Sequence, residues 1–176
     1  CGVGGSAGFF FELNSARPLR YIHTMQLKKI LVPTDFSAAA RAAFRFSLTL
    51  ARGCGADVRL LNVVDLPNEI NDELLVADPD TKDKLLAMKK EAFDAASVKM
   101  AAFEAADDVS GVTVRRFFEV GDIYSAVVRG IAEQGIDLVV LGTNHRPGLD
   151  RFMLGGHAYR IVRGVGCPVT VVRPEG

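Results

Sequence analysis

The chain has 176 residues, of which 49% are hydrophobic and 24% are charged, a composition typical of one globular domain with a substantial core. Its 21 Lys and Arg residues balance its 21 Asp and Glu residues, so no net field favours nucleic acid or an anionic membrane as a partner. No apolar run reaches the ~18 residues that a membrane-spanning helix requires.

The three cysteines lack the spacing of a metal or redox site, which predicts reduced thiols and a cytoplasmic protein. Residues 1–24 are rich in glycine, have no clean hydrophobic period and do not fit a secretory signal. Met25 begins a segment that leads directly into the first expected strand. We expect 1–24 to be a poorly ordered extension and 25–176 to form a single domain.

From Leu27 onward, short runs rich in β-branched residues alternate with longer segments of helical period. Expected strands lie at 28–33, 56–65, 111–120, 136–142 and 167–173. Expected helices lie at about 37–53, 82–106, from 121 onward, and 156–163, and the acidic stretch 66–84 is expected to be a surface loop. This order predicts an α/β fold with an open, mainly parallel sheet and helices on both faces.

Two helix features are predicted from residue types. Ser37 precedes the first helix and is suited to cap it, while Gly53 and Gly55 are expected to end it. Three arginines lie opposite the apolar positions of the same helix, and we expect them to form a solvated face. They are Arg41, Arg45 and Arg52.

The loops after the first and fourth strands carry the residues that suit a ligand site. In an open parallel sheet, ligands bind beyond the carboxyl ends of strands, where the order of winding reverses. Asp35 is suited to accept a hydrogen bond from a ribose hydroxyl or an adenine amino group. Gly142 lets the backbone leave its strand unobstructed, and Gly155 and Gly156 would place bare N–H groups at a helix start, where phosphate binds.

Both features have plainer interpretations. Asp35 is equally suited to cap the first helix together with Ser37. A glycine-rich loop is often only a turn, and the glycines here have neither the Walker spacing nor that of a dinucleotide-binding strand–helix turn.

Five segments, in order and at matching spacing, carry a resemblance to a known family. They are ILVPTDFS (30–37), VGD (120–122), DLVVLGT (137–143), GLDRFMLGG (148–156) and CPVTVVR (167–173). Over residues 26–174 the chain resembles the universal stress protein family. The resemblance implies a Rossmann-like fold of the adenine nucleotide alpha hydrolase type, with five parallel strands in the order 3-2-1-4-5. It also implies a homodimer through the last strand, 168–172, an apolar edge otherwise open to pairing.

Family members that hold ATP carry the pattern Gly-x2-Gly-x9-Gly-Ser/Thr. Gly142 and Gly155 match its first and third glycines, whereas His145 and Gly156 replace the second glycine and the Ser/Thr. The resemblance therefore implies a stress-response signalling module that binds ATP, with Mg²⁺ as the companion ion. His145, with Arg146 beside it, either donates to a phosphate or blocks the crevice. The alternative is a dimeric stress scaffold without nucleotide, its crevice closed by His145.

The resemblance also assigns the remaining contacts: Val63 matches an adenine wall, and His157 and Ala158 match residues that meet the phosphates. The residues expected at the nucleotide are Pro33, Thr34, Asp35, Val63, Leu141, Gly142, His145, Arg146, Gly155, Gly156, His157 and Ala158. We identify no catalytic residue and no metal site. Without an evident base, carboxylate cluster or loop lysine, enzymatic activity would extend at most to slow ATP hydrolysis.

Overall fold

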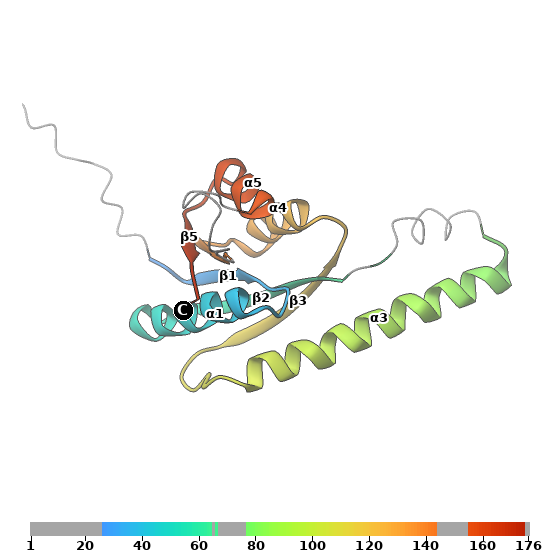
Figure 1. The fold of residues 1–176 in the computed structure, drawn as a ribbon, viewed down its shortest axis with the longest axis horizontal. Coiled ribbons are helices and arrows are strands. Elements are labelled where there is room, and N and C mark those ends of the chain that lie inside the picture. Colours follow the sequence, from blue (N-terminus) through green and yellow to red (C-terminus); the bar gives the residue numbers. More distant parts are fainter. Residues whose placement is uncertain (1–25, 65, 67–76, 144–154, 175–176) are drawn as a thin grey trace, which may run out of the picture.

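The computed structural model describes residues 26–64, 66, 77–143 and 155–174. The predicted extension 1–24, most of the acidic loop, and the roles of His145 and Arg146 lie outside these ranges. Strands and helices alternate as predicted (Figure 1). The elements are β1 (Lys29–Pro33), α1 (Ala38–Cys54), β2 (Asp57–Val64), α3 (Pro79–Ala105), β3 (Val114–Val120), α4 (Ile123–Gln134), β4 (Leu138–Gly142), α5 (Gly156–Gly164) and β5 (Val169–Val172).

The sheet has the predicted topology. Its strands are all parallel and pair in the order β3-β2-β1-β4-β5. Ile30 of β1 is in register with Val58 of β2 on one side and with Leu138 of β4 on the other. The winding therefore reverses between β1 and β4, and the carboxyl ends of these two strands are where a sheet of this kind places a ligand.

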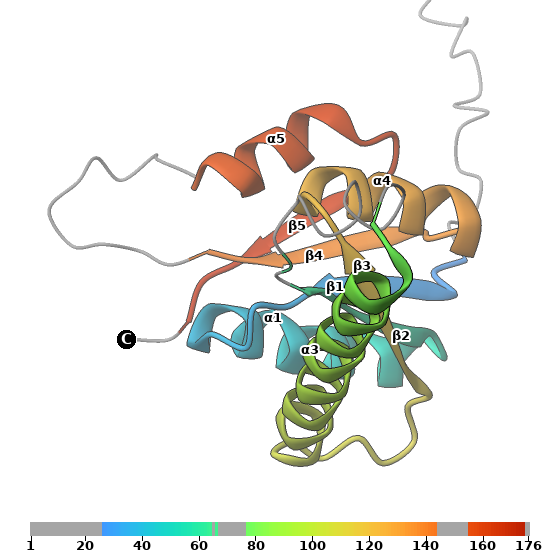
Figure 2. The ribbon, with the colours of Figure 1, turned by 90° about the vertical axis from the view of Figure 1, so that its right-hand side faces the viewer.

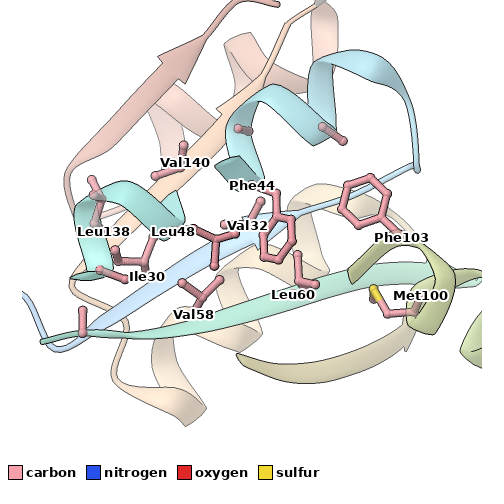
Figure 3. Close-up of a cluster of buried hydrophobic side chains, with 14 residues drawn as sticks. Ile30, Val32, Phe44, Leu48, Val58, Leu60, Met100, Phe103, Leu138 and Val140 are labelled. Atoms are coloured by element: carbon pink, nitrogen blue, oxygen red, sulfur yellow. The ribbon is translucent and has the colours of Figure 1, made fainter. Parts of the chain in front are cut away.

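Helices cover both faces of the sheet, also as predicted: α1 and α3 lie on one face, and α4 and α5 on the other (Figure 2). The alternation of side chains along β1 separates two cores, because Ile30 and Val32 face α1 whereas Leu31 faces α4. In the first core, Phe44 of α1 and Phe103 of α3 pack with their ring centroids 5.7 Å apart (Figure 3).

Two helix boundaries differ from prediction. The helix α3 begins at Pro79, inside the stretch expected to be loop, because the Asp78 carboxylate caps it by accepting from the N–H groups of Asp80 and Thr81. The helix α1 passes through Gly53 and ends at Gly55 alone, whose φ of 72° and N–H bond to Ala51 make the left-handed cap.

The predicted solvated face of α1 is confirmed for Arg45 and Arg52, which are exposed, whereas Arg41 is half-buried. Arg41 and Arg45 both pair with Asp107, at 2.7 and 2.5 Å, and the Arg41 guanidinium lies 4.4 Å from the ring centroid of Phe103. Arg52 pairs with Asp108 in the same connection. These pairs fix the end of α3 to α1, which a helical period cannot reveal because it identifies a face but not what packs on it.

Candidate functional site

The chain leaves β1 through a turn whose backbone is held by β2. The N–H of Thr34 donates to the carbonyl of Leu61 at 2.7 Å, and the carbonyl of Thr34 accepts from the side-chain amide of Asn62 at 2.8 Å. Thr34 and Asn62 are 5% and 7% exposed, so little water competes for these bonds. The start of the turn is therefore fixed in place by the neighbouring strand.

The next residues close the turn through side-chain oxygens. Oγ1 of Thr34 accepts from the N–H of Phe36, and Oδ1 of Asp35 accepts from the N–H of Ser37, both at 3.0 Å. Phe36 has a φ of 65°, a left-handed backbone that costs an ordinary residue about 1–2 kcal/mol. Its ring packs edge-on against Phe103, with centroids 5.8 Å apart, and this contact helps to hold the turn.

The two interpretations of Asp35 separate at this turn. Ser37 alone is the N-cap of α1, with its Oγ accepting from the N–H of Ala40 at 3.2 Å. Asp35 uses Oδ1 within the turn, is exposed, and leaves Oδ2 without a partner among the residues that the structure describes. One carboxylate oxygen is therefore available to a ligand.

Gly142 ends β4 directly against the first turn of α1. A Cβ at Gly142 would lie 2.2 Å from the carbonyl oxygen of Ala39 and 2.7 Å from the nitrogen of Ala40, far inside van der Waals contact with backbone atoms. Only glycine permits this approach. Gly142 therefore allows β4 to pack on α1. From the sequence we expected the glycine only to let the backbone leave its strand without a side chain in the way.

The helix α5 starts without a side-chain cap. Its N-cap is Gly155, which makes no capping hydrogen bond, whereas Ser37 caps α1 and Asp122 caps α4. The N–H groups of the first turn, 156–158, have no carbonyl partner within the helix. A Cβ at Gly155 or Gly156 would meet nothing within 4 Å among the described atoms, so packing does not explain these glycines as it explains Gly142.

These segments surround one cavity of about 290 Å³ at the carboxyl ends of β1 and β4. It is lined by all the predicted residues that the structure describes, except for Gly155 and Gly156. Those lining residues are Pro33, Thr34, Asp35, Val63, Leu141, Gly142, His157 and Ala158. A largely apolar cavity with a few polar groups at its edge is typical of a small-molecule site.

Five further residues line the cavity that were not predicted as site residues from the sequence. They are Ser37, Ala39, Ala40, Ile123 and Ile161. The two alanines stand in the first turn of α1, where their small size admits β4, and nothing in the helical period marks them apart from other apolar positions. Ile123 directly follows the VGD segment, which is one of the segments that carry the family resemblance, and that position was a signal that could have placed the start of α4 at the site.

The lining carries one carboxylate, Asp35, and one imidazole, His157, which is exposed. In the described part of the chain, no group of three or more His, Cys, Asp or Glu residues is arranged to hold a metal ion. None of the described helices has both the length and the apolar character that crossing a bilayer demands. The described lining offers a ligand apolar walls, one acceptor oxygen and a helix start that attracts anions.

Comparison with known proteins agrees with this architecture. The universal stress protein family model matches residues 26–173. Universal stress protein MJ0531 of Methanocaldococcus jannaschii is 32% identical over 152 residues, which cover 83% of this chain and 82% of that protein. The solved structure of MJ0577 from the same organism aligns with a TM-score of 0.66 and 24% identity, covering 86% of this chain and 99% of that one.

A universal stress protein crystallised in complex with cAMP also shares the fold, with a TM-score of 0.51 and 19% identity over 85% of this chain and 99% of that one. The family model spans nearly all of the described residues, and the strand order is the one that the resemblance implied. The chain therefore belongs to the universal stress protein family.

Proposed function

We propose that this protein binds an adenine nucleotide, ATP, in the cavity between β1 and β4. We further propose that the protein is a dimeric stress-response module of the cytosol, which signals by whether this cavity holds a nucleotide. One observation carries the proposal: the same cavity is lined by Asp35, whose Oδ2 has no partner among the described residues, and by His157 and Ala158 from the uncapped start of α5. The two groups match the two ends of a nucleotide.

The adenosine end fits the ends of β1, β2 and β4. Val63, Leu141 and Pro33 supply apolar walls for a flat base, and Asp35 Oδ2 is an acceptor for a ribose hydroxyl or the adenine amino group. Because Asn62 and Leu61 hold Thr34, the carboxylate is presented without a large loss of backbone freedom on binding.

The phosphate end fits α5. Free N–H groups and the positive end of the helix dipole stabilise an anion at 156–158, and no side chain of the helix competes for them. Mg²⁺ would accompany ATP through the phosphates themselves, as this ion usually is held mainly by phosphate and water. The solved relative in complex with cAMP supports an adenine nucleotide as the class of ligand.

The second candidate is a dimeric scaffold that binds no nucleotide. It is favoured by one observation, the packing of Gly142 on Ala39, since this contact accounts for the first motif glycine without any ligand. His145, the residue that would close the crevice in this case, lies outside the described residues.

The dimer is proposed to form through β5, the edge strand of the sheet, whose residues Val169–Val172 are all half-buried in the single chain. An apolar edge of this kind pairs readily with a second strand. Sedimentation at micromolar concentration should give the mass of two chains, and Val171→Lys should shift it to that of one. A wild-type chain that sediments only as a monomer contradicts this part of the proposal.

Nucleotide extraction tests the proposal against the scaffold. The chain has no Trp and three Tyr, so bound adenine should dominate its absorbance near 260 nm. Denaturing the purified protein and chromatographing the supernatant should release an adenine nucleotide. A protein that carries none, and whose melting temperature does not rise with added ATP, would be the scaffold.

A further inference from the structure

Arg160 lies on α5, one turn after the cavity residue His157, and faces the start of α4. Its Nη1 is 3.9 Å from Oδ1 of Asp122, and its guanidinium carbon is 5.0 Å from the ring centroid of Tyr124. Asp122 directly precedes Ile123, which lines the cavity. Since helical side chains tilt toward the helix N-terminus, the guanidinium stands at the cavity end of α5, between two helix starts.

The pairing of Arg160 with Asp122 is loose. At 3.9 Å it exceeds hydrogen-bonding distance, and the Arg160 side chain is 57% exposed. The Asp122 carboxylate is already occupied by its own helix, because Oδ1 accepts from the N–H groups of Tyr124 and Ser125 and Oδ2 accepts from the Ser125 hydroxyl. That hydroxyl bond also holds the pKa of Asp122 below its ordinary value.

The other described arginines of α4 and α5 each donate a hydrogen bond to a side chain of the protein. Arg129 donates to Glu119 at 2.9 Å, and Arg163 donates to the Tyr159 hydroxyl at 2.5 Å. Arg160 makes no hydrogen bond to the part of the chain that the structure describes. The Arg160 guanidinium, beside the residue that precedes Ile123 of the cavity lining, therefore keeps its planar set of donors, the arrangement that binds phosphate in bidentate fashion.

We propose that Arg160 recognises the length of the phosphate chain: with a di- or triphosphate in the cavity, the guanidinium leaves Asp122 and binds the outer phosphates. The inference rests on the proposed nucleotide function and assigns a phosphate-contacting residue to that site. The N–H groups of α5 take the first phosphate, and Arg160 takes those that extend beyond it. Although Asp122 makes no hydrogen bond to Arg160, its negative charge still attracts the guanidinium, so a single phosphate gains little from Arg160.

Calorimetric titration with adenosine, AMP, ADP and ATP, at one fixed Mg²⁺ concentration, tests this assignment. In the wild type, affinity should rise from AMP to ATP. Arg160→Gln should bind adenosine as the wild type does and ATP about tenfold more weakly, the effect of one charge-assisted bond. Arg163→Gln, a matched change one turn further along α5, should leave the whole series unchanged.

The outcomes separate the two proposals. A wild type that binds neither adenosine nor ATP overturns the nucleotide function and this inference together. A wild type that binds ATP, while Arg160→Gln weakens adenosine and ATP equally or neither, overturns only the role of Arg160.

Asp122→Asn gives a second test, because Asn caps a helix about as well as Asp. If Asp122 holds Arg160 back, this change should tighten ATP binding more in the wild type than in the Arg160→Gln background. If Arg160 merely neutralises Asp122, the gain should be larger in the Arg160→Gln background, where the carboxylate is uncompensated. The second result overturns the competition.

Discussion

Gly142 of β4 and Ala39 of α1 approach so closely that no methyl group fits between them, since a Cβ at Gly142 would lie 2.2 Å from the Ala39 carbonyl oxygen. The contact brings the end of β4 against the start of α1 and so shapes one wall of the cavity. A glycine that belongs to a nucleotide-binding pattern thus also has a structural task that exists without nucleotide.

Gly142→Ala should therefore destabilise the protein in the absence of any ligand. Forcing a methyl group against backbone atoms should lower the free energy of unfolding by about 1–3 kcal/mol in urea. Gly53→Ala is the matched control, because Gly53 lies inside α1 with open space around it. That change should raise the free energy of unfolding by about 0.5–1 kcal/mol. Equal stability of Gly142→Ala and wild type would refute the packing role.

Asn62 is predicted to position the turn that carries Asp35. Asn62→Ala leaves the buried Thr34 carbonyl without its donor, which should cost about 1–3 kcal/mol of unfolding free energy. Binding of ATP should weaken as well, because the carboxylate is no longer presented in one place. Asn62→Asp preserves size but not the donor, and should behave similarly. If both variants bind ATP with wild-type affinity, the turn does not depend on this bond.

Asp35→Asn distinguishes the role of Asp35 in the turn from its proposed role in binding the ligand. The Asn side-chain oxygen still accepts from the N–H of Ser37, so unfolding free energy should stay within about 0.5 kcal/mol of wild type. Adenosine and ATP should both bind about tenfold more weakly, because the amide NH2 group, which can only donate, replaces the acceptor Oδ2. Calorimetry measures both ligands. Unchanged affinity for adenosine would remove Asp35 from the site.

Asp122 should make the start of α4 sensitive to acid. The hydrogen bond from the Ser125 hydroxyl, with the N–H bonds of the first turn, lowers the pKa of this carboxyl from 3.8. A depressed pKa in the folded state means that the carboxylate stabilises the fold above the ordinary pKa and loses this contribution as pH falls through the folded value. Ser125→Ala should raise the Asp122 pKa, measured by carboxyl NMR titration. An unchanged pKa would show that the hydroxyl bond is absent in solution.

Much of the fold was predictable because it depends on local pattern and on family spacing. Apolar runs marked every strand, and Ser37 marked the start of α1. The strand order came from the resemblance alone, since no pattern along the chain states which strands are neighbours. The start of α3 was missed because Asp78 and Pro79, a good cap and first residue, stand within an acidic stretch typical of loops.

What sequence could not provide were the contacts between distant segments. Arg41 and Asp107 are 66 positions apart, and their pairing depends on how α3 returns to α1. Asn62 lies in an apolar strand, and its role appears only when β2 is placed beside the β1 turn. The spacing of Gly142 and Gly155 is the same whether a glycine serves packing or phosphate, and only the surroundings distinguish a glycine pressed against backbone from one in open space.

Amide NMR during titration with adenosine and with ATP tests the central claim most directly. If one nucleotide spans the cavity, both ligands should shift the signals of Asp35 and Val63, while ATP alone should strongly shift the N–H signals of Gly156, His157 and Ala158. If saturating ATP leaves the amide signals at the start of α5 unshifted, the account is contradicted, even if ATP binds elsewhere on the protein.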